Sequence, residues 1–222
     1  MNVLRFMIDN ADKCWLLTWE HIWIVSVAIF LAILIGVPTG IAITRSERAA
    51  QNVINAANVL MTTPSIALFG IMLPILSIVN LGLGKVPAVI ALVLYCQLPI
   101  IRNTYTAIRN VPPELVEAAR GLGMSPWRVL REIEIPLAIP VIIAGLRTAA
   151  VMSIGIAAIA AYIGAGGLGV FIQQGIARTY QEMIITGAVL VSVLAIGVDG
   201  GMALLERLVT PRGLKIGQAG VS

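Results

Sequence analysis

Charged residues are scarce in this sequence of 222 residues. Asp, Glu, Lys and Arg together make up 12% of the chain, whereas hydrophobic residues make up 59%. Soluble domains carry about 25% charged residues and about 45–50% apolar ones. With so little polar material, a water-soluble fold of this chain would expose large apolar patches and aggregate. The composition therefore predicts an integral membrane protein.

Cysteine and histidine are nearly absent. Cys14 and Cys96 are the only two cysteines and lie far apart, which excludes a disulfide framework and a CxxC metal motif. His21 is the only histidine, so neither an HExxH zinc motif nor a histidine-rich metal cluster can form. The sequence offers no convincing nucleophile–base set either. We therefore expect no catalytic residue, no metal site and no cofactor, which argues against a membrane-embedded enzyme.

Long apolar runs, by contrast, are abundant. The hydrocarbon core of a bilayer is about 30 Å thick and needs about 20 apolar residues in a helix. Five runs meet this need: residues 22–43, 53–79, 86–108, 136–163 and 183–205. Pro64 and Pro74 lie within the second run and are expected to kink it. The sequence predicts an all-α polytopic membrane protein, a single domain with five transmembrane helices.

Lys and Arg are unevenly distributed among the segments between these runs. Segments 44–52, 102–135 and 206–222 hold ten of them, including Arg212 and Lys215, whereas the alternate segments hold four. Cytoplasmic loops of membrane proteins are enriched in Lys and Arg. We therefore expect the N-terminus outside the cell and the C-terminus in the cytoplasm. The formal net charge of +4 is attributed to topology rather than to nucleic-acid binding.

A glycine-rich segment, GAGGLGVFIQQG, separates the last two runs on the expected outer side, at residues 164–175. Two interpretations are open. The segment is either a flexible loop or a compact turn followed by a short amphipathic stretch over residues 168–172. The flexible loop is slightly favoured.

The largest expected cytoplasmic segment, residues 109–135, lies between the third and fourth runs. Pro113 suits the first position of a helix, and Glu114 favours its N-terminal end. Gly121 and Gly123 end that helix, and Ser125 is a suitable N-cap for a second one. The segment is therefore expected to form a helix, a glycine turn and a second helix before a span that opens at Pro136. A DNA-binding helix-turn-helix is disfavoured because arginines and glutamates nearly balance.

The same segment carries a recognisable motif. Glu117, Ala118 and Ala119 are followed by Gly123 and, after nine intervening residues, by Ile133-x-Ile135-Pro136. This pattern resembles the EAA loop of ABC importer permeases, with Ile135 where leucine is usual. The resemblance implies a coupling helix that docks into a separate nucleotide-binding ATPase. It implies that Glu117 anchors the docking and that Gly123 permits the sharp turn. The residues assigned to ATPase docking are Glu117, Ala118, Ala119, Gly123, Ile133 and Pro136.

Residues from about 38 to 175 resemble one branch of these permeases, the carriers of glycine betaine, carnitine and choline. The stretches TTPSIALFG, LPIIRNTYTAI and AAYIGAGGLG carry this resemblance. It implies uptake of osmoprotectants across the inner membrane of a prokaryote. The implied partners are an ATPase subunit, an external binding protein and a second permease, identical or similar, in addition to membrane lipid. The sequence has no GxxxxGK[ST] phosphate loop of its own.

Two alternatives stay open. A permease for methionine or another amino acid would share the EAA loop and the five spans. A secondary transporter or channel would need no ATPase and would leave the EAA spacing a coincidence, and is therefore the weaker alternative.

Apart from Arg102, which is counted with segment 102–135, Arg147 and Asp199 are the two charged residues inside predicted spans. A charge in a bilayer is costly unless it is paired or hydrated. Both residues are expected at similar depths from the cytoplasmic side, and we hypothesise that they form an ion pair. A quaternary ammonium substrate would be attracted to aromatic faces. Tyr95, Tyr105 and Tyr162 are therefore the candidate residues of a substrate path.

Overall fold

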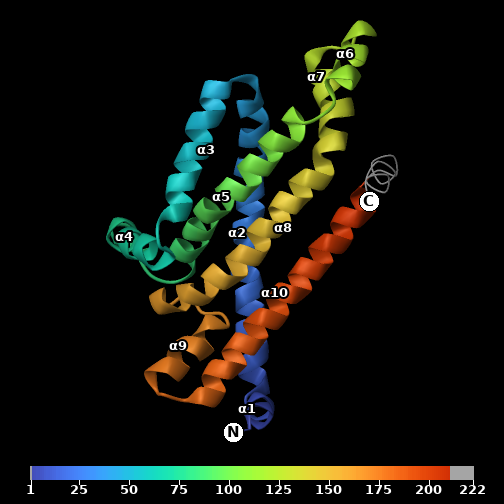
Figure 1. Cartoon of the computed structure of the whole chain (residues 1–222). Helices are drawn as coiled ribbons and strands as arrows, with labels where there is room; N and C mark the ends of the chain where they lie inside the picture. The colour runs from blue at the N-terminus through green and yellow to red at the C-terminus, as the bar shows by residue number, and fades with distance from the viewer. Residues whose placement is uncertain (1, 211–222) are drawn as a thin grey trace.

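The computed structural model describes residues 2–210, and every regular element in this part of the chain is a helix. Figure 1 shows long helices running between two ends of the molecule. A two-helix loop projects from one end, called the loop end below, and the N-terminus lies at the opposite end. The elements are α1 (Val3–Asp9), α2 (Ala11–Ala42), η1 (Ile43–Arg45), α3 (Glu47–Thr62), α4 (Ser65–Ser77), α5 (Lys85–Arg109), α6 (Pro113–Gly121), α7 (Pro126–Val129), η2 (Leu130–Glu134), α8 (Ile135–Ile159), η3 (Ala160–Ile163), α9 (Gly169–Ala177) and α10 (Gln181–Val209).

Four helical segments are long and apolar enough to cross a membrane. They are Ala11–Arg45, Lys85–Arg109, Pro126–Ile163 and Gln181–Val209. A fifth crossing is formed if α3 and α4 together make one span, although the two helices are bent by 97° at their junction. The predicted all-α membrane fold is confirmed. The bend expected at Pro64 is present and is a complete break between α3 and α4, whereas Pro74 does not interrupt α4.

The break between α3 and α4 has a local cause at Pro64. The residue before a proline is pushed towards extended backbone, and Thr63 has φ −67° and ψ 127°. The hydroxyl of Tyr95 on α5 donates a hydrogen bond to the Thr63 carbonyl, which the helix no longer uses. Pro74, in contrast, lies inside α4 without ending it.

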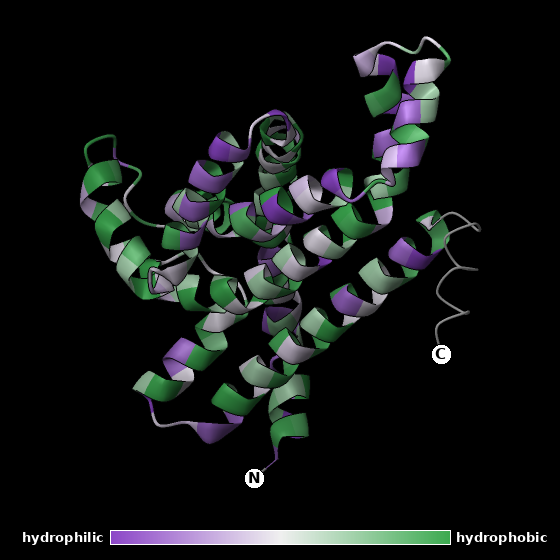
Figure 2. Ribbon diagram, turned by 45° about the horizontal axis from the view of Figure 1, so that its top comes forward, coloured by the Kyte–Doolittle hydropathy of each residue, from purple (hydrophilic) through white to green (hydrophobic). Residues whose placement is uncertain are grey.

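The core lies where α5 packs between α2 and α8. Small residues allow close approach: a Cβ atom on Gly40 of α2 would lie 2.6 Å from Cβ of Thr104 on α5. A Cβ on Gly145 of α8 would lie 2.6 Å from Cβ of Asn103. The fully buried Ala28, Ala88 and Ala91 fill the space between these helices. α10 is peripheral, and Figure 2 shows hydrophobic residues along much of its length.

The glycine-rich segment is ordered, so its interpretation as a flexible loop was wrong. Residues 164–168 form a compact turn, and α9 follows at Gly169–Ala177. Ala165 and Leu168 are fully buried in the turn, and Phe171 is buried on α9. Buried apolar side chains hold the segment in place, which its high glycine content did not indicate.

Candidate functional site: the docking loop

Helix α6 ends in a defined turn rather than in an irregular loop. The amide of Gly123 donates to the carbonyl of Arg120 at 2.9 Å, and the amide of Met124 donates to the carbonyl of Ala119 at 3.2 Å. This pair of bonds is the Schellman arrangement, in which the residue after the C-cap is left-handed. Gly123 occupies that position with φ +82°. A residue with a side chain would be strained there.

The second half of the loop differs from the prediction. Ser125 does occupy the N-cap position of α7, without a side-chain capping bond. However, α7 has only four residues and continues through a π-helical segment, Leu130–Glu134, into α8. Pro136 lies in the first turn of α8, as expected, but the helical stretch before it is continuous from Pro126. A π-turn widens the helix just before the proline, where the missing amide and the ring would otherwise disturb an α-helix.

The motif residues differ in exposure. Glu117 and Ala118 are exposed on α6, whereas Ala119 is only 4% exposed and faces the inside of the loop. Ile133 is half-buried in the π-helical segment, and Pro136 is exposed. The motif thus combines residues that can contact a partner with residues that hold the loop together.

Two exposed apolar side chains at the tip were missed by the sequence analysis. Leu122 is 85% exposed and Trp127 is 65% exposed. Large apolar side chains this open at the tip of a projecting loop are typical of an interaction surface. Their signal in the sequence was weak: a leucine between two glycines, and a tryptophan after a proline.

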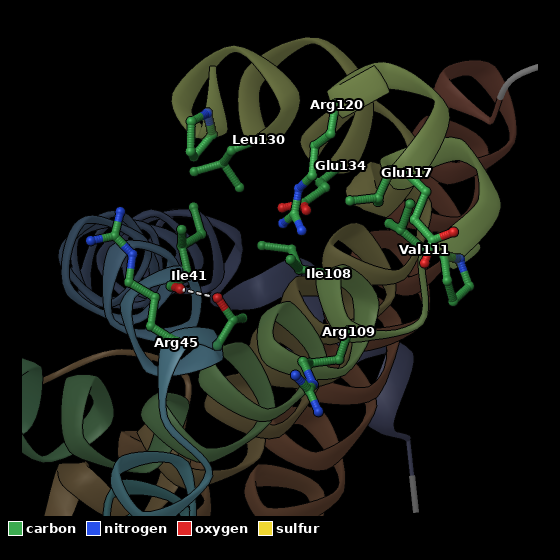
Figure 3. Close-up of a pocket in the computed structure, with 13 residues that line it drawn as sticks. Ile41, Arg45, Ile108, Arg109, Val111, Glu117, Arg120, Leu130 and Glu134 are labelled. Carbon is green, nitrogen blue, oxygen red and sulfur yellow. Dashed lines mark hydrogen bonds between the residues drawn. The ribbon is translucent and has the colours of Figure 1, made fainter. Parts of the chain in front are cut away.

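We call residues 109–135 the docking loop. A cavity of about 430 Å³ lies between this loop and the ends of α2 and α5. Glu117 and Arg120 of α6 line it together with Arg45. Figure 3 shows the Arg120 side chain directed towards Glu134 across this space. The loop is therefore joined to the long helices through its two ends, with a hollow behind α6.

The hypothesised pair of intramembrane charges lies on α8 and α10. Arg147 donates from Nε to Asp199 Oδ1 at 2.6 Å and from Nη2 to Oδ2 at 2.7 Å. This is a bidentate arrangement, the strongest geometry for such a pair. Nη1 of Arg147 also lies 3.6 Å from Oε2 of Glu206. One guanidinium thus faces two carboxylates, and the cluster carries a surplus negative charge.

The sequence pattern that describes inner membrane components of binding-protein-dependent transport systems matches residues 28–211. The chain belongs to this family.

Relatives within the family are similar over nearly their whole length. The osmoprotectant import permease protein OsmW of Salmonella typhimurium is 49% identical, over 97% of this chain and 100% of the relative. The glycine betaine/carnitine/choline transport system permease protein OpuCB of Bacillus subtilis is 44% identical, over 96% of each chain. A carnitine transport permease protein of Listeria monocytogenes is 40% identical, over 98% of each chain.

The fold is also similar to that of a solved transporter. An inward-facing structure of the MetNI methionine ABC transporter has a TM-score of 0.80 and 25% sequence identity. The match covers 90% of this chain and 98% of the chain in that structure. The helical arrangement described above is therefore the arrangement of an ABC transporter permease.

In this family member, the three candidate tyrosines have different environments. Tyr95 is buried and holds the break at Thr63. Tyr105, near the loop end of α5, lines a small cavity of about 210 Å³ against α3. Tyr162 lies in η3 towards the opposite end of α8 and is 50% exposed. The structure therefore does not assemble the three into one aromatic cage.

Proposed function

We propose that this chain is the membrane-spanning subunit of an ATP-driven importer of small quaternary-ammonium osmoprotectants. The single observation that carries the proposal is the projecting α6–α7 loop with its EAA motif. Such a loop would allow this membrane subunit to couple to a separate subunit that binds ATP. The names of the relatives at 40–49% identity favour glycine betaine, carnitine or choline over methionine.

The loop end is assigned to the cytoplasm. Segments at this end contain Arg45, Arg48, Arg102, Arg109, Arg120, Arg128, Arg131 and Arg207. The opposite end has Arg5, Lys13, Lys85 and Arg178. The excess of arginine supports a cytoplasmic loop end and an N-terminus outside. Arg212 and Lys215, which the sequence analysis also assigned to the cytoplasmic side, lie outside the described residues.

The docking loop is proposed to contact the ATPase through its exposed tip. Leu122 and Trp127 would supply apolar contact, and the carboxylate of Glu117 would supply a charged one. Aromatic residues are over-represented among those that dominate binding energy at interfaces. The left-handed turn at Gly123 fixes the angle between α6 and α7, and thereby the relative placement of these three side chains.

A second permease subunit is proposed to complete the path. Within residues 2–210, the interfaces of α2, α5 and α8 are packed mostly with alanine and aliphatic side chains, which favours a substrate path between two chains. The cluster of Arg147, Asp199 and Glu206 supports this proposal. Its side chains are 31–42% exposed and line an open cavity of about 460 Å³. Charges at such a depth face protein or water rather than lipid. Tyr105 and Tyr162 stay candidates for contact with a quaternary ammonium group, because part of each side chain is accessible.

The experiment is uptake by vesicles that contain this chain with its ATPase and its binding protein. Labelled glycine betaine, carnitine, choline and methionine are compared with and without ATP. Glu117→Lys is the test variant. Glu132→Lys is the matched control, because it makes the same charge change in the same loop and breaks only an exposed pair with Arg128. Such a pair contributes little to stability.

ATP-dependent uptake of a quaternary amine, lost in Glu117→Lys and kept in Glu132→Lys, is the expected result. Uptake of methionine alone would retain the coupling mechanism and refute the proposed substrate. Uptake that persists without ATP or without the ATPase would refute the ABC mechanism in favour of a secondary transporter.

A further inference from the structure

Two adjacent residues of α2, Glu20 and His21, bind the turn at residues 164–168 at the end opposite the docking loop. The amide of Gly167 donates to Oε2 of Glu20 at 3.1 Å. The amide of Leu168 donates to Nδ1 of His21 at 3.2 Å. These contacts join positions 147 residues apart in the sequence. We call the two side chains and their bonds to the turn the latch.

His21 is fully buried, and both its ring nitrogens have partners. Nδ1 accepts from Leu168, so the proton of the neutral ring lies on Nε2. Nε2 is 3.1 Å from the carbonyl oxygen of Ile154 on α8, which can only accept. The ring therefore connects α2, α8 and the turn at one point.

The turn is shaped to receive this pair. Gly167 has φ +75°, and a Cβ atom there would lie 3.1 Å from Nδ1 of His21. A Cβ on Gly166 would collide with the Glu20 carboxylate. Glycine is thus required both by the backbone conformation and by the approach of α2.

The latch sets the position of α9, which begins at Gly169 directly after the turn. Gly169 is buried and packs against the carbonyl of Ala158, and Gly187 of α10 packs against Phe171 and Ile172 of α9. The far end of α9 carries the exposed residues Ile176, Arg178 and Tyr180, although Gly175 packs against Ile184 of α10 and the Tyr180 ring meets Phe6 edge-on. A shift of the turn would therefore displace the start of α9 and, with it, the exposed segment that follows.

We propose that Glu20 and His21 are positioning residues that hold α9 and the following segment, residues 176–180, in the orientation needed to receive the external binding protein. The inference rests on the proposed function in one respect, that this end faces outside. The binding protein contacts residues 176–180, and the latch acts on it only through α9.

Substitutions at position 21 separate the two bonds of the ring. The side-chain amide of asparagine lies where Nδ1 of histidine lies, and its oxygen can still accept a hydrogen bond from the Leu168 amide. Glutamine reaches the place of Nε2 and can still donate to Ile154. His21→Asn is therefore expected to retain wild-type behaviour, whereas His21→Gln and His21→Ala release the turn. Loss of a buried hydrogen bond that holds the turn is expected to raise the released population about tenfold.

Substitutions at position 20 separate the turn contact from the ion pair. Glu20 also pairs through Oε1 with Nζ of Lys85 at 3.3 Å, and this pair is partly exposed. Glu20→Gln keeps an acceptor for Gly167, and Lys85→Ala removes the ion pair and the contact of Lys85 Nζ with the Trp23 ring, but neither bond to the turn. Both are expected to behave as wild type, because exposed pairs contribute little. Glu20→Ala is expected to behave as His21→Ala.

Two measurements are made on the assembled transporter in sealed vesicles. The first is the concentration of substrate-loaded binding protein that half-saturates stimulation of ATP hydrolysis, expected to rise about tenfold in His21→Ala and Glu20→Ala. The second is the rate of tryptic cleavage after Arg178, relative to cleavage after Lys13 in the same chain. This rate is expected to rise in the same two variants, and co-purification of the ATPase should not change.

Equal behaviour of His21→Asn and His21→Gln in both measurements would overturn the proposal, since only one of them keeps the bond to the turn. Faster cleavage with an unchanged response to binding protein would reduce the latch to a structural contact and also refute it. If the wild type shows no stimulation at all, the proposed function fails instead, and the cleavage series still tests the latch.

Discussion

The left-handed residue at the tip of the docking loop offers the sharpest test of how the loop is built. Gly121 and Gly123 are two residues apart, and a Cβ atom on either would meet no atom within 4 Å. The two glycines therefore differ in backbone conformation and not in available space. Gly121 is helical, whereas Gly123 has φ +82°. Comparing Gly123→Ala with Gly121→Ala therefore isolates the free-energy cost of the left-handed backbone at position 123.

Alanine at position 123 should destabilise the turn by about 1–2 kcal/mol, the cost of left-handed backbone for a residue with a Cβ atom. Since 1.4 kcal/mol corresponds to a factor of ten, the native turn loses about 5- to 30-fold in population relative to other conformations. Gly121→Ala should cost nothing, because alanine favours helix over glycine. Asparagine tolerates left-handed backbone, so Gly123→Asn should fall between wild type and Gly123→Ala.

The assay is the affinity of the ATPase subunit for the permease in nanodiscs, together with ATP-dependent uptake in vesicles. Affinity should decrease in the order Gly121→Ala, Gly123→Asn, Gly123→Ala, with Gly121→Ala equal to wild type. Equal losses for the two alanine variants would refute the reasoning, because the effect would then follow from adding a methyl group to the loop surface rather than from backbone strain.

Three further outcomes are expected. Gly40→Ala should lower the stability of the purified permease by about 1–3 kcal/mol in thermal unfolding, because its Cβ would press on Thr104 Cβ, whereas Gly155→Ala, with nothing within 4 Å, should not. Arg147→Asp and Asp199→Arg should each abolish uptake and the double exchange should restore part of it; a double variant as inactive as the single ones would argue against the pair. Leu122→Ser and Trp127→Ser should weaken ATPase binding without changing thermal unfolding, and unchanged binding would exclude the tip from the interface.

The proline residues illustrate how far the sequence predicts this fold. Apolar runs identify the long helices, because hydropathy alone decides which segments can cross a bilayer. The effect of a proline within a run is not decided locally. Pro38, Pro74, Pro99 and Pro140 all lie inside helices, whereas Pro64 separates two. The break at Pro64 has a partner in Tyr95, from another helix, and no pattern around the proline contains that information.

The docking loop was more predictable than the opposite end. Its turn is specified by residues close together in sequence, such as Pro113, Gly123 and Ser125, which act on their own backbone. His21 was treated only as a lone histidine, since its partners, Ile154 and Leu168, are 133 and 147 residues away. Contacts of this range arise only when the helices are packed. The glycine-rich turn was misjudged for the same reason.

The length of α2 has a practical consequence. Its 32 residues extend about 48 Å at 1.5 Å per residue. Even at a tilt of 40°, a bilayer core of about 30 Å accommodates only about 39 Å of helix. At least about six residues of α2 must then lie outside the hydrocarbon core, and the polar Asp12 and Lys13 identify the N-terminal turns as that part. In the proposed topology, an epitope or fluorophore joined ahead of α1 would lie outside the hydrocarbon core on the outer side, and its accessibility in intact cells would test that topology.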